Sequence, residues 1–167
     1  VWKRMRRSSR SKRNEQDFQT AKTHLARLRA VCGAADRDFD LIYFDPFSPA
    51  SNPTLWTVDF ARRLRSKARY EGAALVTYST ATPTRVMFLL AGFFVGHGIG
   101  AGTRSESTFA STQRALVPTP LGDRWLQRWL RSSARGPHGG ECSAEVEQRV
   151  TSHPQFAGEK RAHRFAT

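Results

Sequence analysis

Cysteines and long apolar stretches are scarce in this sequence, and each shortage excludes a class of protein. Only two cysteines, Cys32 and Cys142, occur among the 167 residues, and they form neither a disulfide framework nor a zinc-binding pattern. The longest apolar run, residues 86–96, has about half the length that a membrane span requires. We therefore expect a cytoplasmic protein that has no membrane-spanning helix and no metal site.

Acidic residues are also few, so the chain is strongly basic. The 14 Asp and Glu residues face 27 Lys and Arg residues, which gives a net charge of +13. Such a balance predicts a polyanionic partner such as RNA. Residues 1–13 contain no acidic residue and no apolar segment of a secretory signal. This arm either lies along phosphates or is a solvated, disordered end.

The chain is long enough for one domain, and its pattern between residues 14 and 133 alternates between helix and strand. Helical spacing predicts a helix over residues 14–30, a second after Thr57 and a third from Thr82, with Pro83 in its first turn. Short apolar runs predict strands at residues 41–44 and 73–78 and from Phe93 onward. This order predicts right-handed crossovers and a parallel sheet. The sequence begins with Val1 rather than Met, so we expect its natural N-terminus to lie upstream.

Glycines gather between residues 96 and 102 and permit two interpretations. A glycine-rich cofactor loop needs a strand before it and an amphipathic helix directly after it. Residues 103–112, which follow, are polar and β-prone, with no clear helical stripe. The pattern therefore favours a turn between two antiparallel strands.

The C-terminal part begins with one amphipathic helix and then loses its apolar pattern. Trp125 and Trp129 recur at helical spacing beside exposed arginines, which favours docking into the core over an RNA-stacking platform. Residues 134–167 are rich in Gly, Pro, Ser and charges. We expect them to form a disordered tail, whose scattered histidines lack the spacing of metal ligands.

The rest of the chain is arranged around the stretch at residues 40–56. The apolar run at residues 41–44 is typical of a strand covered on both faces, and it ends at Asp45. Ligands of open α/β sheets bind outside the carboxyl ends of the strands. Three prolines stiffen the loop that follows, so we expect a binding rim; the alternative is a strand exit whose Asp caps the next turn. The expected rim consists of Asp45, Pro46, Phe47, Ser48, Pro49, Asn52 and Trp56.

These residues resemble a known family, the MnmC-like methyltransferase domain. The resemblance rests on residues 40–57 and continues through Thr77-Tyr78-Ser79, Ala91-Gly92-Phe93 and the turn leading to Arg104, where the family commonly has Lys. It covers roughly residues 39–132. The family acts on tRNA, where it completes 5-methylaminomethyl-2-thiouridine at the wobble position. It implies a Rossmann-like class I methyltransferase fold with S-adenosylmethionine as cofactor, and some relatives carry a fused oxidase domain.

The resemblance also implies roles for individual residues. Asp45 would be catalytic and would orient an amine together with the Pro46 carbonyl, while Phe47 and Trp56 would wall the pocket. The implied substrate-binding residues are Pro46, Phe47, Ser48, Pro49, Asn52, Trp56, Tyr78, Ser79 and Arg104.

Part of the family's pattern has no counterpart in the sequence. We find no glycine-rich cofactor loop before Phe39, so the chain would hold the last four strands of the sheet, the final pair antiparallel, with flanking helices. We expect three parts: a basic arm (1–13), the C-terminal half of the domain (14–133) and a tail (134–167). The predicted function is tRNA N-methylation by a fragment that lacks the cofactor-binding half. The alternatives are a non-catalytic RNA-binding module and an inactive remnant.

Overall fold

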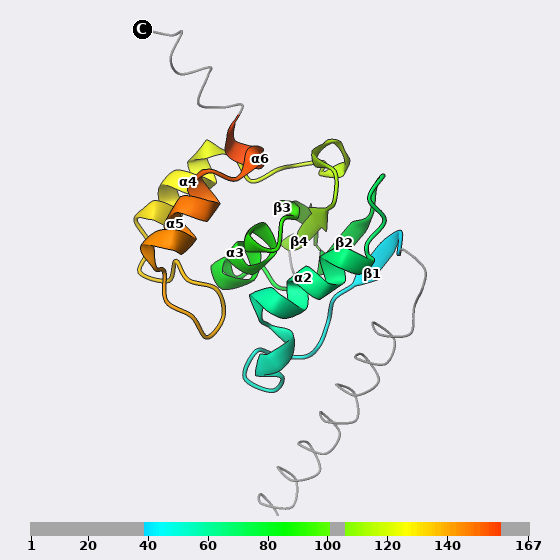
Figure 1. Ribbon diagram of the computed structural model, residues 1–167, viewed down its shortest axis with the longest axis horizontal. Helices are drawn as coiled ribbons and strands as arrows, with labels where there is room; N and C mark the ends of the chain where they lie inside the picture. Colours follow the sequence, from blue (N-terminus) through cyan, green and yellow to red (C-terminus); the bar gives the residue numbers. More distant parts are fainter. Residues whose placement is uncertain (1–38, 101–105, 158–167) are drawn as a thin grey trace, which may run out of the picture.

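The computed structural model describes residues 39–100 and 106–157 and shows a mixed sheet with helices packed around it (Figure 1). The sheet order is β1-β2-β4-β3, with β1 parallel to β2 and β4 antiparallel to both of its neighbours. The four strands are β1 (Leu41–Tyr43), β2 (Ala74–Thr77), β3 (Phe94–Ile99) and β4 (Glu106–Ser111). The predicted α/β sheet with an antiparallel final pair is therefore confirmed. The predicted arm and the helix at residues 14–30 lie outside the described residues.

Among the described residues, helices cover only one face of strand β1, which differs from the expectation of a strand buried on both faces. Phe44, directly after β1, packs against Phe60 of α2 (Val58–Lys67) and Phe88 of α3 (Thr82–Leu90), at ring-centroid distances of 6.2 and 5.5 Å. Side chains alternate between the faces of a strand. Leu41 and Tyr43 therefore point away from these helices and are 48% and 77% exposed.

Helices α2 and α3 begin where the sequence predicts. The Thr57 hydroxyl accepts a hydrogen bond from the Phe60 N–H (3.2 Å) and so caps α2. Helix α3 has Pro83 in its first turn, where the missing N–H costs nothing, and it ends before Gly92, whose φ of 89° favours glycine. Both helices bury apolar side chains in the same core.

Two glycines of the glycine-rich segment belong to strand β3 and are required by close packing. A Cβ on Gly96 would lie 2.4 Å from the Thr119 carbonyl oxygen, and one on Gly98 would lie 2.3 Å from Ser107 Oγ. Strand β3 pairs antiparallel with β4, which confirms the prediction of two antiparallel strands. The residues that connect them, 101–105, lie outside the described part of the chain.

The described part of the C-terminal segment, up to residue 157, forms helices that pack on the sheet, which differs from the disordered tail that composition predicts. It contains α5 (Ala144–Thr151) and α6 (Pro154–Ala157). The fully buried Gln155 side chain accepts a hydrogen bond from Val95 N–H (2.6 Å) and donates to the Val95 and Leu121 carbonyls (2.7 and 2.8 Å). These bonds give partners to the Val95 N–H on the outer edge of β3 and to the Leu121 carbonyl, while the Val95 carbonyl also accepts a hydrogen bond from the Leu121 N–H (2.9 Å).

Helix α4 (Asp123–Leu130) lies beside α5 and α6 at the β3 end of the sheet, away from β1 (Figure 1). Trp125 stacks between Trp129 and Phe156, at centroid distances of 6.3 and 6.2 Å and nearly parallel. The prediction that these tryptophans dock into the core is therefore confirmed. Two short 3-10 helices, Pro53–Leu55 and Arg114–Leu116, complete the described elements. None of the described helices combines the length and apolar character that crossing a bilayer requires.

Candidate functional site

The candidate site is built on the loop that leaves the carboxyl end of β1. Asp45 is exposed and makes no hydrogen bond or ion pair with another described residue. Phe47 is 57% exposed and has a φ of 61°, which is strained for a residue with a bulky side chain. An exposed carboxylate and an exposed aromatic ring thus lie two residues apart at the edge where α/β sheets bind ligands.

Hydrogen bonds within the protein hold this loop in its strained shape. The buried Asn52 amide donates to the Pro46 carbonyl (2.8 Å), and the Tyr78 hydroxyl donates to the Phe47 carbonyl (2.7 Å). The Ser48 hydroxyl bonds to that of Ser51 (2.9 Å). Asn52 and Ser48 therefore stabilise the loop. The resemblance implied that the Pro46 carbonyl binds an amine, but the Asn52 amide already occupies one of the two acceptor positions of this carbonyl.

Trp56 lies in the core and not on the rim of the site. Its side chain is fully buried, with centroid distances of 5.0 Å to Phe44, 6.4 Å to Tyr78 and 5.2 Å to His138. Its indole N–H has no hydrogen-bond partner among the described residues. Trp56 thus packs in the core beneath the loop. It does not form the wall of a pocket, as the resemblance implied. Pro49 is half-buried in the same loop.

A hydroxyl–imidazole network runs inward from the carboxyl end of β2. Ser79 Oγ bonds to Thr84 Oγ1 (2.9 Å), and Thr84 Oγ1 bonds to His138 Nε2 (2.8 Å). Burial lowers the pKa of His138 and so favours its neutral form. The network links the predicted Ser79 to a histidine that lies more than fifty residues away in the sequence.

A second polar cluster lies at the same edge, where β4 begins. The Glu106 carboxylate accepts hydrogen bonds from the Arg85 guanidinium and from His97 Nδ1, the latter at 2.7 Å. Arg85 Nε also donates to Thr108 Oγ1 (3.2 Å). The hydrogen bonds from Arg85 and then His97 lower the pKa of Glu106, so the carboxylate is ionised and neutralises the nearly buried Arg85.

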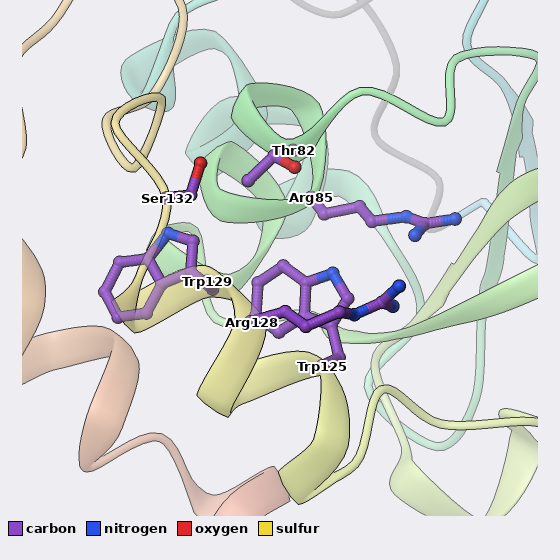
Figure 2. Close-up of a pocket in the computed structure, with 6 residues that line it drawn as sticks. All are labelled: Thr82, Arg85, Trp125, Arg128, Trp129 and Ser132. Atoms are coloured by element: carbon purple, nitrogen blue, oxygen red, sulfur yellow. The ribbon is translucent and has the colours of Figure 1, made fainter.

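A pocket of about 290 Å³ opens between the first turns of α3 and the buried face of α4 (Figure 2). Hydroxyl, indole and guanidinium groups meet in it. The lining residues are Thr82, Arg85, Trp125, Arg128, Trp129 and Ser132.

Sequence reasoning found the loop but missed most of these polar partners. Among the predicted site residues, Arg104 lies outside the described part of the chain. The sequence analysis assigned no role to Glu106, although a carboxylate at the start of a strand that pairs with a glycine-rich strand is a detectable signal. His138 sits in a Gly- and Pro-rich segment with no pattern that indicates its contact with Thr84.

The described residues suit one end of the implied cofactor, S-adenosylmethionine. An exposed carboxylate and aromatic face attract a positively charged sulfonium or amine, and Asp45 and Phe47 provide both. Within residues 39–100 and 106–157 the glycines of β3 pair with β4 and form no cradle for a nucleoside.

Comparison with known proteins places the chain in a family. The profile of the family described as S-adenosyl-L-methionine-dependent methyltransferase matches residues 2–113. This range begins well before Phe39, where the sequence analysis placed the start of the resemblance, and ends before residue 132. The family region therefore includes part of the chain that precedes the described residues.

Individual relatives agree with this assignment. The chain is 32% identical to the tRNA 5-methylaminomethyl-2-thiouridine biosynthesis bifunctional protein MnmC of Ralstonia nicotianae, over 76% of this chain and 20% of that protein. It is 36% identical to the Aeromonas salmonicida protein of the same name, over 47% and 12%. An uncharacterised protein of Methanocaldococcus jannaschii is 26% identical, over 64% and 30%. The chain thus spans less than a third of these curated relatives.

The fold has a counterpart among solved structures. MNMC2 from Aquifex aeolicus superposes with a TM-score of 0.54 at 24% identity, covering 76% of this chain and 42% of that one. The match supports the arrangement of the sheet and helices. From the profile, the relatives and the fold together, the chain belongs to the S-adenosyl-L-methionine-dependent methyltransferase family, and within it to the MnmC-like methyltransferase domains.

Proposed function

We propose that this chain acts in the N-methylation of an aminomethyl group on the wobble uridine of tRNA, with S-adenosylmethionine as the methyl donor. The observation that carries the proposal is the exposed Asp45 beside the exposed, strained Phe47 on a loop fixed by Asn52 and Tyr78. The names of the two bifunctional relatives support the choice of tRNA and of an aminomethyl acceptor.

The loop has the groups that methyl transfer to an amine requires. When bound, S-adenosylmethionine supplies an electrophilic methyl group on a sulfonium centre. The amine nitrogen must direct its lone pair along the methyl–sulfur axis, and hydrogen bonds that hold its protons enforce that direction. Asp45 accepts those protons, with the remaining acceptor position of the Pro46 carbonyl as a second contact. Transfer would form the new carbon–nitrogen bond while the methyl–sulfur bond of the donor breaks and its electron pair stays on sulfur, and the proton released from the amine would pass to Asp45 or to solvent.

A labelled methyl group tests the proposal directly. The chain is incubated with labelled S-adenosylmethionine and with tRNA that carries, or lacks, the aminomethyl group. We expect label in the aminomethyl tRNA only. Label in neither tRNA contradicts the proposal.

The second candidate is a non-catalytic RNA-binding module, and the exposed arginines of α4 favour it. Its signature in the same experiment is tRNA that is retained by the protein, with an affinity that falls steeply with salt, but stays unlabelled. A chain that binds no tRNA contradicts both candidates.

A further inference from the structure

Helix α4 presents two opposite faces, of which one carries only basic charge. Trp125, Leu126 and Trp129 are buried. Arg124, Arg128 and the C-terminal Arg131 are exposed and recur at intervals of four and three residues, so they share one face of the helix. None of these three guanidinium groups forms an ion pair or hydrogen bond within residues 39–100 and 106–157.

Helix α2 is similarly rich in basic residues, but most of its charges are used internally. Arg62 pairs with Asp59 (2.8 Å). Arg65 donates to the Gly92 carbonyl (3.4 Å) and lies 5.7 Å from the centre of the Phe93 ring, and Lys67 also has a partner. The two helices thus differ in how many cations they leave available to a ligand, although α2 carries more basic residues.

Like charges at neighbouring positions on one helix face repel one another and destabilise the helix. An anionic partner removes this cost. The seven-residue interval from Arg124 to Arg131 spans about 10 Å along the helix axis, a length over which a nucleic-acid strand presents several phosphates.

The pocket beside α4 extends this basic face toward the candidate site. Arg128 belongs to both, and Figure 2 shows its guanidinium beside Trp125 on the same side as that of Arg85. Because Glu106 neutralises Arg85, Arg128 supplies the uncompensated charge of the lining residues. Thr82 lies at the first turn of α3, three residues after Ser79. A strand that follows α4 into the pocket therefore arrives near the carboxyl end of β2.

We infer that the face formed by Arg124, Arg128 and Arg131, together with the adjoining pocket, binds the sugar–phosphate backbone of RNA and leads it toward the Asp45 loop. The inference rests on the proposed function for its choice of tRNA. It assigns the electrostatic contact to α4 and not to α2, although both helices are basic.

Two double variants with the same change in charge test the inference. Filter binding of tRNA is measured across a salt series for Arg124→Gln/Arg128→Gln and for the control Arg62→Gln/Arg63→Gln. We expect the α4 variant to bind about tenfold or more weakly at low salt, and its slope of log affinity against log salt to fall by about 1.5, as removal of two phosphate contacts predicts. The α2 variant should retain the parent slope. All four arginines are exposed. Thermal melts of both variants serve as the control for folding.

Equal losses in the two variants overturn the inference, because they indicate a response to net charge alone. Binding to vesicles of anionic phospholipid without binding to tRNA overturns it as well. Failure of the methyl-transfer proposal gives a different result, since tRNA binding would then still depend on α4 while no label is transferred.

Discussion

Asp45 is the residue on which the proposed chemistry depends, and its exposed position leaves its carboxylate accessible to a substrate. It is exposed and lies on a loop whose shape is maintained by other residues, Asn52 and Tyr78. Removing its charge should therefore change the chemistry while leaving the loop in place.

We predict that Asp45→Asn lowers the single-turnover rate of methyl transfer by about a hundredfold or more, the range for loss of a positioned acid–base group. An amide still accepts one hydrogen bond, so residual activity is expected. The thermal melt should match that of the parent. A variant that reacts as fast as the parent would mean that Asp45 only caps the turn.

Gln155 has a structural role, because its side chain bonds to the backbone of two other segments. We predict that Gln155→Leu destabilises the protein by about 3 kcal/mol, because it leaves the buried Val95 N–H and the Leu121 carbonyl without partners, at about 1–3 kcal/mol each. Urea denaturation measures the change. The matched control is Gln148→Leu on the exposed face of α5, which should shift stability by less than about 0.5 kcal/mol. Similar losses in both variants would contradict this role.

At the scale of elements, the parts of the fold fixed by local chemistry were predictable from the sequence. Thr57 caps α2, Pro83 opens α3 and Gly92 ends it, and each signal acts within a few residues. The apolar run that ends at Asp45 placed the loop correctly at the sheet edge. The antiparallel pairing of β3 and β4 followed from the absence of a helical pattern after the glycines.

The errors have a common cause, which is contact over long sequence distances. Gln155 reaches Val95, and Arg149 of α5 donates to the Leu90 carbonyl of α3 (2.9 Å), so a polar, glycine-rich segment becomes ordered. Trp56 is drawn into the core by Phe44 and by His138. Local composition and periodicity do not reveal such contacts. A segment without an apolar helical stripe is therefore predicted to be disordered even when distant residues hold it in place.

Helices α5 and α6 provide a test at this scale. We predict that a chain ending after Ala134 loses its cooperative thermal transition, because Val150, Gln155 and Phe156 no longer cover β3 and α4. A chain ending after Ala157 keeps every contact among the described residues and should retain a cooperative transition. If the shorter chain also melts cooperatively at the parent temperature, the segment is not part of the fold.

At the scale of the whole molecule, pH should act on stability through the C-terminal segment. Burial against Phe94 and Phe156 lowers the pKa of His153 from 6.5 to about 4, so the unfolded chain binds a proton that the folded chain rejects. Stability should fall as pH falls from 6.5 to 4, by up to about 3 kcal/mol. His138 acts in the same direction, and Glu106, whose pKa is lowered, adds a loss below about 4.5.

Urea denaturation at a series of pH values measures this dependence. His153→Asn removes the titrating group, so the slope between pH 6.5 and 4.5 should become shallower even if the variant is less stable overall. An unchanged slope would show that His153 does not titrate in the folded protein as its burial requires.

The sheet brings the proposed parts to one edge of the molecule. Asp45 follows β1, Ser79 follows β2 and Glu106 begins β4, while the arginines of α4 lie beyond the adjoining pocket. An RNA strand held by α4 therefore leads toward the same edge as the Asp45 loop. In the proposed arrangement, acceptor recognition and RNA binding belong to separate elements and can be measured separately.

The most direct test of acceptor recognition compares the binding of two tRNAs, with and without the aminomethyl group, by the parent chain and by Asp45→Asn. A charge-assisted hydrogen bond to the amine contributes about 1.5 kcal/mol or more, so the parent should prefer the aminomethyl tRNA about tenfold. The preference should disappear in Asp45→Asn, while binding of the unmodified tRNA stays the same. If the parent binds both tRNAs equally, or if the preference survives the substitution, Asp45 does not recognise the amine and the account is wrong.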